Sequence, residues 1–301
     1  MSAEVLVRDE DLRRRILEPR TLASAGLTGL TWLLAGLACV PLVSVLYMLI
    51  VRGGARLDAA LFTELPPAAF EVGGGFGNAM LGTAVMVGIA GGIAVPVGVL
   101  AAILLAELSP EGRLARLCRF CARTLTGLPS ILAGVFAYAL VVLTTGTYSA
   151  PAGGVALAIL MLPTVILTSE EALRMVPRGI RLAAYGMGCT RTQVVWKILV
   201  PTALPGMITG VLLAVARAAG ETAPLLFTAL FSEYWLFGPE GLELMEPTAS
   251  LAVLIYNYAG MPFENQVELA WAASLVLVTG ILALNLASRA LGARFDPARP
   301  R

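Results

Sequence analysis

Two oppositely charged residues, Arg217 and Glu221, lie four residues apart within one of the most apolar stretches of the chain, residues 205–231. An ionisable side chain at bilayer depth costs about 3 kcal/mol on insertion scales, and it usually marks a transport or relay site. The spacing places both side chains on one face of a helix, where each partly neutralises the other. The pair therefore indicates a membrane transport pathway, and the alternative is a structural ion pair that joins two helices.

The composition predicts an all-α polytopic membrane protein. A chain of 301 residues that is 58% hydrophobic and 14% charged has too little polar surface to remain soluble. A helix needs about 20 apolar residues to cross the hydrocarbon core. Six runs predict six transmembrane helices: 27–51, 77–105, 125–145, 153–168, 205–231 and 267–288. The fourth run is the shortest, and Pro163 and Thr164 within it predict a kinked or locally unwound span.

The basic residues are distributed asymmetrically across these predicted spans. With the N-terminus inside, the 21 Lys and Arg residues are all cytoplasmic except Arg52 and Arg56, which lie outside, and Arg217, which lies within the bilayer. This pattern follows the positive-inside rule and places both termini in the cytoplasm. The predicted outer segments instead hold nine carboxylates: Asp58, Glu64, Glu71, Glu233, Glu240, Glu243, Glu246, Glu264 and Glu268.

The first apolar run is too long for the core of a signal peptide, so we expect an uncleaved first span. The predicted organisation is a cytoplasmic segment at 1–26, a six-span permease domain at 27–288 and a cytoplasmic tail at 289–301. The six-span domain includes a cytoplasmic hairpin at 169–204 and an outer loop at 232–266.

Residue content argues against several kinds of chemistry. The chain has no histidine, which removes Ser-His and Cys-His catalysis. Cys118 and Cys121 have C-x-x-C spacing, but they have neither the second ligand pair of a zinc site nor the βαβ context of a redox motif. The only lysine, Lys197, is not part of a Walker A loop. We therefore expect no catalytic residue, metal or cofactor in this chain, and any ATP hydrolysis would belong to a partner.

The predicted cytoplasmic hairpin has clear helix signals. Pro177 can begin a helix that runs until Gly188 offers a left-handed stop. Thr190 and Gln193 form a capping box for a second helix, which Pro201 is expected to end. On spacing alone, the hairpin either docks a partner in the cytoplasm or rests as an amphipathic segment on the inner membrane surface.

The hairpin resembles the EAA loop of ABC-importer permeases, the coupling helix that inserts into a cleft on the ATPase subunit. The matching residues are Ala183, Ala184, Gly188, Ile198 and Pro201. Four further stretches are similar to the PstA-type permeases of phosphate importers, and the GETAP block in the first is the most specific. These stretches are 216–227, 128–131, 249–253 and 269–273, and the resemblance covers about residues 77–288.

This resemblance implies the six-span type I ABC-importer permease fold in the bacterial cytoplasmic (inner) membrane. It implies a permease subunit of an ATP-driven phosphate importer that forms half of the translocation pathway. The implied partners are a PstC-like permease, two PstB-like ATPases holding ATP and Mg²⁺, a PstS-like phosphate-binding protein, inorganic phosphate and the lipid bilayer. No nucleic acid is expected among them.

The chemistry of the Arg217 segment suits a phosphate pathway. A guanidinium offers planar, bidentate donors to an oxyanion and does not deprotonate. We expect Arg217 to receive the anion, Glu221 to hold the arginine in place when the site is empty, and Thr222 to lie in the same pathway. Pro224 removes a backbone hydrogen bond to the turn at Gly220, which predicts local unwinding.

Two positions depart from the family pattern. Leu182 replaces the glutamate of the EAA motif, so a polar contact expected with the ATPase is missing or supplied elsewhere. Leu167 stands where members often carry an arginine before the Thr-Ser-Glu-Glu stretch at 168–171. Arg217 is then the one cationic side chain that the sequence clearly places within the bilayer.

Three other functions remain open. The first is a permease of the same architecture for sulfate, molybdate or another oxyanion. The second is a secondary transporter in which Glu221 carries a proton, although the cytoplasmic hairpin and the lack of a visible internal repeat argue against it. The third is a membrane scaffold that transports nothing. The outer carboxylates disfavour electrostatic capture of free phosphate, which favours delivery by a binding protein.

Overall fold

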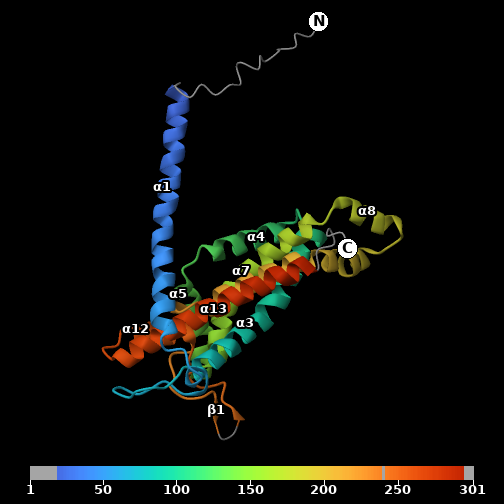
Figure 1. The fold of residues 1–301 in the computed structure, drawn as a ribbon. Coiled ribbons are helices and arrows are strands. Elements are labelled where there is room, and N and C mark those ends of the chain that lie inside the picture. Colours follow the sequence, from blue (N-terminus) through green and yellow to red (C-terminus); the bar gives the residue numbers. More distant parts are fainter. Residues whose placement is uncertain (1–18, 239–240, 295–301) are drawn as a thin grey trace. The chain divides into compact units, whose positions relative to one another are not determined.

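A computed structural model describes residues 19–238 and 241–294 (Figure 1). The predicted cytoplasmic ends fall partly outside these ranges, as does Glu240 of the predicted outer loop. The chain divides into two compact units, residues 1–51 and 52–301. In the first unit, α1 (Pro19–Met48) carries no charged residue after Arg20. The predicted first span lies within the apolar helix Thr21–Gly53, which includes the π-helical turn η1 (Leu49–Gly53).

The second unit is helical apart from a short β hairpin, within the described residues. Its helices are α2 (Ala60–Thr63), α3 (Gly77–Ile103), η2 (Leu104–Leu108), α4 (Arg113–Thr126), α5 (Ser130–Ala137), η3 (Tyr138–Val142), α6 (Leu143–Thr145), α7 (Ala150–Met175), α8 (Arg178–Gly186), α9 (Arg191–Val194), η4 (Val195–Leu199), α10 (Val200–Ala219), α11 (Ala223–Leu226), α12 (Leu251–Ala259) and α13 (Glu264–Arg294). The antiparallel strands β1 (Phe237–Gly238) and β2 (Gly241–Leu242) pair Phe237 with Leu242.

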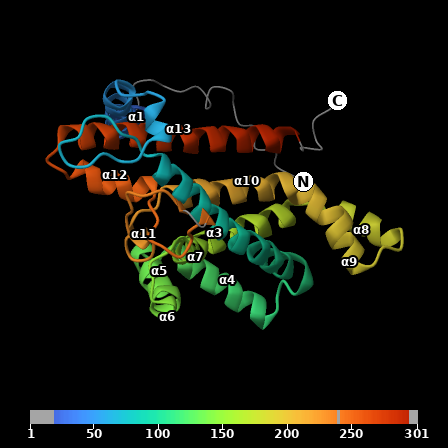
Figure 2. The same ribbon diagram turned by 90° about the horizontal axis from the view of Figure 1, so that it is seen from below.

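Helix α7 is the centre of this unit and contacts α3, α4, α5 and α10 (Figure 2). Small residues allow the backbones to approach closely, as is usual between membrane helices. A Cβ atom at Gly98 of α3 would lie 2.7 Å from a methyl carbon of Val165, and one at Gly210 of α10 would lie 2.1 Å from the hydroxyl of Thr168. A larger residue at either position would force the facing side chain of α7, Val165 or Thr168, to shift.

Five helices in the described residues are long and apolar enough to cross a membrane, and a bent pair can supply a sixth span. The bent pair consists of α4 and the segment Ser130–Thr145, which meet at 109° across the Gly127–Pro129 turn. The predicted third run, 125–145, therefore begins in α4 and contains the bend. Proline at position 129 disfavours helical geometry at Leu128, which accounts for the interruption.

The prediction of a short or locally unwound fourth span is wrong, whereas the alternative prediction of a kink stays a prediction. Helix α7 has 26 residues, begins where Ser149 accepts a hydrogen bond from the Ala152 amide, and continues without interruption past Pro163. The predicted fourth run ended at residue 168 because the next residues, Ser169 and Glu170, are polar. Both are nevertheless buried, so the helix extends beyond its apolar part.

The prediction of a helical hairpin is confirmed for its glycine turn and for the N-terminal cap of its second helix. Helix α8 begins after Pro177, Gly188 has a φ of +81°, and Thr190 and Gln193 form the capping box. Pro201, however, does not end the second helix. Residues Arg191–Ala219 form one helix of 29 residues. Pro201 occupies the first turn of α10, directly after the π-helical turn η4, where a missing backbone N–H is tolerated.

The two basic residues predicted outside the membrane contact the start of α13. Arg56 donates to the side chain and carbonyl of Asn265, and its Nη1 lies 3.3 Å from a carboxylate oxygen of Glu268. The guanidinium of Arg52 lies 5.6 Å from the ring centroid of Trp271. Arg52 and Arg56, the two exceptions to the predicted cytoplasmic placement of basic residues, therefore both have side-chain partners in the same unit.

Candidate functional site

The predicted pathway residues lie at an interruption in the fifth apolar run. Helix α10 ends at Ala219, and the amide of Glu221 still donates to the carbonyl of Ala218 at 3.2 Å. The short helix α11 then begins at Ala223 with Pro224 in its first turn. The run 205–231 is therefore not one continuous helix, and the unwinding predicted around Gly220 is present.

Arg217 and Glu221 form the expected ion pair across this helix end. Nε of Arg217 lies 3.3 Å from Oε1 of Glu221, and the two side chains are 49% and 18% exposed. Both residues belong to one continuous segment, so the pair does not join two helices of the described chain. The alternative interpretation, a structural ion pair that joins two helices, therefore loses its main support within this subunit.

The guanidinium of Arg217 retains free donors in this arrangement. Its Nε donates to Glu221, but among the described residues neither Nη1 nor Nη2 has a hydrogen-bond partner. An arginine can donate through five N–H groups, and its two terminal nitrogens match the spacing of oxygens on an oxyanion. Arg217 is thus held from one side and open on another, which is the arrangement that a transient anion site requires.

Thr222 helps to shape the segment that follows the pair. Its carbonyl accepts hydrogen bonds from the amides of Leu225 at 3.1 Å and Leu226 at 3.3 Å, which close the first turn of α11. A Cβ atom at Gly134 would lie 2.6 Å from Cα of Pro224, so α5 packs directly against α11. The absence of a side chain at Gly134 therefore positions the turn that carries Thr222.

A second charged cluster, which sequence reasoning missed, joins η2, α4 and α7. The carboxylate of Glu170 is 8% exposed and lies 2.7 Å from both Nε of Arg119 and Nη2 of Arg174. Arg119 also donates to the carbonyls of Leu105 and Pro110. The i,i+4 spacing of Glu170 and Arg174 was a visible signal, but the contact with Arg119 spans 51 residues and depends on helix packing.

The hairpin is attached to the same end of the bundle by further charges. Nη2 of Arg181 lies 2.8 Å from Oε1 of Glu107 and donates to the carbonyl of Leu173. Arg191 donates to the backbone carbonyls of Glu107 and Leu108. These contacts connect α8 and α9 to η2, which follows α3, and to the end of α7.

The five predicted coupling residues occupy different environments. Ala183 and Gly188 are exposed, as is Pro201 farther along the chain. Ala184 is buried among apolar side chains that include Leu173 and Val194, and Ile198 is half-buried beside them. The exposed residues can meet a partner, whereas Ala184 holds the hairpin to its own subunit. Figure 1 shows α8 at the opposite end of the second unit from the β hairpin.

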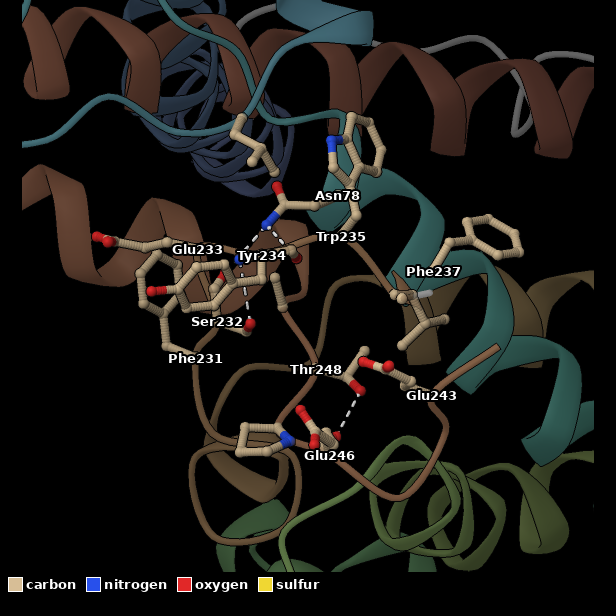
Figure 3. Close-up of a pocket in the computed structure, with 15 residues that line it drawn as sticks. Asn78, Phe231, Ser232, Glu233, Tyr234, Trp235, Phe237, Glu243, Glu246 and Thr248 are labelled. Atoms are coloured by element: carbon tan, nitrogen blue, oxygen red, sulfur yellow. Dashed lines mark hydrogen bonds between the residues drawn. The ribbon is translucent and has the colours of Figure 1, made fainter. Parts of the chain in front are cut away.

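A cavity of about 750 Å³ lies in the predicted outer loop, away from Arg217. Asn78 shapes it by donating to the carbonyls of Ser232 and Tyr234 (Figure 3). Its lining includes three carboxylates, those of Glu233, Glu243 and Glu246. Carboxylates repel an oxyanion, so the cavity is unsuited to phosphate despite its size.

Residues 94–299 match the family described as the binding-protein-dependent transport system inner membrane component. The chain belongs to this family. It is therefore a multi-pass permease component of the inner membrane, and the expectation of a permease fold is confirmed. The match spans the central helix α7, the hairpin and the segment of Arg217, so the Arg217–Glu221 pair, the Glu170 cluster and the predicted coupling residues lie within the family's own domain.

Named relatives are phosphate permeases. The chain is 38% identical over 253 residues to the phosphate transport system permease protein PstA of Yersinia pestis, covering 84% of each chain. It is 42% identical over 245 residues to that of Haemophilus influenzae, covering 81% of this chain and 85% of the relative. An inward-facing structure of the MetNI methionine ABC transporter matches with a TM-score of 0.56 at 21% identity, over 71% of this chain and 93% of the other. The structural match supports the fold alone.

Proposed function

We propose that this chain is the permease subunit of an ATP-driven phosphate importer and forms half of its translocation pathway. The observation that carries the proposal is the guanidinium of Arg217, whose two terminal nitrogens lack partners among the described residues beside a break in an apolar helix. The relatives named as phosphate permeases, at 38% and 42% identity, support the choice of substrate.

The geometry suggests how the site binds an anion and also releases it. A phosphate oxygen pair meets Nη1 and Nη2 of Arg217, while Glu221 occupies Nε and holds the guanidinium plane. The fixed negative charge of Glu221 lowers the affinity for a second negative group, which keeps release possible. Arg217 belongs to the last turn of α10, whereas Glu221 lies in the unwound backbone at Gly220 to Thr222, so Glu221 can move relative to Arg217 without breaking the ladder of hydrogen bonds inside the helix.

The hairpin couples this site to a separate ATPase. Exposed residues of α8 and the following turn, among them Ala183, Leu182 and Gly188, form the contact, while buried Ala184 fixes the hairpin to its own subunit. Ile198 and Pro201 shape the helix that leads back to Arg217. ATP and Mg²⁺ bind the two PstB-like ATPases, the other half of the pathway is a PstC-like permease, and a PstS-like protein delivers phosphate from outside.

The hypothesis is tested with vesicles that contain the assembled complex. We expect ATP-dependent uptake of labelled phosphate, with unlabelled phosphate competing and sulfate or molybdate competing poorly. Equal uptake of sulfate would support the rival oxyanion permease. Phosphate uptake driven by a proton gradient without ATP would instead support the proton-coupled transporter, because no ATPase would be required.

A further inference from the structure

A basic depression of about 450 Å³ lies on α4, outside the site described above. Its lining residues all come from this one helix: Arg116, Arg119, Phe120, Arg123 and Thr124. The helix begins shortly after α3 ends and packs through Ala115 and Ala122 against Leu105 and Ile166. By the charge pattern, its arginines lie on the inner side of the membrane.

Two of the three arginines lack a counter-ion in the described residues. Arg119 pairs with Glu170, but neither Arg116 nor Arg123 has a carboxylate within ion-pair distance there, and neither side chain donates a hydrogen bond. Arg116 and Arg123 are seven residues apart, which corresponds to about 10 Å along a helix, and Arg119 lies between them. Arg116 and Arg123 therefore add two positive charges to the face that holds Arg119, and like charges there are unfavourable without an anion to bridge them.

Exposed apolar side chains lie on the same helix beside these arginines. Phe120, which lines the depression, is 67% exposed, and Leu114 and Leu117 are also exposed. A free inorganic anion satisfies the arginines but leaves these side chains uncovered. A phospholipid covers both features, because its phosphate meets the guanidinium groups and its acyl chain lies against the apolar side chains.

We propose that this depression binds the phosphate group of an anionic phospholipid from the inner leaflet. The bound headgroup contacts Arg116 and Arg123, and Arg119, whose three nitrogens donate to Glu170, Pro110 and Leu105, contributes its positive charge beside the headgroup. Glu170 also pairs with Arg174, near the end of α7, and α8 follows after two residues. Lipid composition therefore affects the base of the coupling hairpin through Arg119 and Glu170.

The test uses the assembled complex in nanodiscs of phosphatidylcholine with a minor fraction of phosphatidylglycerol. The anionic lipid retained after detergent extraction is quantified by mass spectrometry. The test variant is the double substitution Arg116→Gln and Arg123→Gln. The matched control is Arg113→Gln, an exposed arginine on the same helix that does not line the depression.

We expect the wild type and the control to retain phosphatidylglycerol, and the double variant to bind it about 30-fold more weakly, given the usual contribution of basic residues at an anionic surface. Each single substitution is expected to give part of this loss, which provides a readout if the double variant assembles poorly. Equal retention in all variants overturns the proposal.

A second arm separates the two sources of phosphate chemistry. Labelled inorganic phosphate is added to complexes in nanodiscs of pure phosphatidylcholine. The proposal predicts no saturable binding that depends on Arg116 and Arg123. Binding that the double variant abolishes would assign the depression to the transported anion and would overturn the lipid assignment. Neither arm requires transport, so failure here leaves the proposed function standing.

Discussion

The Arg217 segment and the Glu170 cluster use the same kinds of side chain in opposite ways. Glu221 pairs with an arginine four residues away, both groups are partly exposed, and the guanidinium keeps free donors among the described residues. Glu170 is buried, and it receives one arginine from α4 and another from its own helix. The first arrangement leaves capacity for a ligand, whereas the second uses its capacity to fix helices together. A guanidinium that keeps free donors therefore marks a candidate ligand site, and one whose donors all have partners marks a structural contact.

The largest effect is expected from Arg217→Gln. The amide still forms hydrogen bonds but loses the charge, so phosphate uptake should fall about 100-fold, since charge-assisted hydrogen bonds contribute up to about 3 kcal/mol. Uptake in vesicles measures the loss, and copurification of the other subunits checks assembly. Arg217→Lys serves as the control, because it keeps the charge and loses bidentate geometry. Wild-type uptake in an assembled Gln variant would remove Arg217 from the pathway.

Glu170→Ala is expected to destabilise the protein more than it changes the affinity for phosphate. Removing the carboxylate leaves Arg119, which is largely buried, without its counter-ion, and such losses cost about 3 kcal/mol. Thermal unfolding of the purified complex measures this change. Glu171→Ala is the matched control, because Glu171 is exposed on the same helix. If both variants unfold at the same temperature, the contrast between the two charge clusters fails.

A smaller effect is expected at the hairpin turn. Gly188 has a φ of +81° and nothing near its Cβ position, so Gly188→Val introduces backbone strain without a steric clash. The left-handed conformation costs about 1–2 kcal/mol for a residue with a side chain. We expect weaker copurification of the ATPase and lower substrate-stimulated ATP hydrolysis.

Two controls isolate the backbone effect at Gly188. Gly188→Asn should retain more coupling, because asparagine tolerates this conformation, and Gly186→Ala should be close to neutral. Normal ATPase coupling in the Val variant would indicate that the hairpin rests on the membrane instead of on the ATPase.

The smallest effect on activity is expected from single cysteines that report topology. Cys39 and Cys121 are exposed, so the experiment requires a cysteine-free background. Tyr234→Cys in the outer loop should react with a membrane-impermeant thiol reagent in intact cells. Thr192→Cys at the hairpin should react only after permeabilisation. The reverse pattern would place the hairpin outside and separate it from any ATPase.

Local signals predicted much of the hairpin and of the Arg217 site. The turn at Gly188, the capping box at Thr190 and the ion pair of Arg217 with Glu221 each depend on residues a few positions apart. Such features are determined by backbone preferences and by i,i+4 geometry, which a sequence displays directly. The continuation of α10 through Pro201 was missed because a preceding π-helical turn offsets the usual effect of proline.

The sequence by itself determined the membrane character, the charge asymmetry across the predicted spans and the proximity of Arg217 to Glu221. Apolar length, basic residues and short-range spacing are properties of the chain that need no tertiary contact. Only the tertiary structure decided that Glu170 joins α4 to α7, that Ala184 is buried while Ala183 is exposed, and that α7 continues through buried polar residues. These features depend on which helices pack together, because a charge 51 residues away becomes a partner only after the intervening chain has folded.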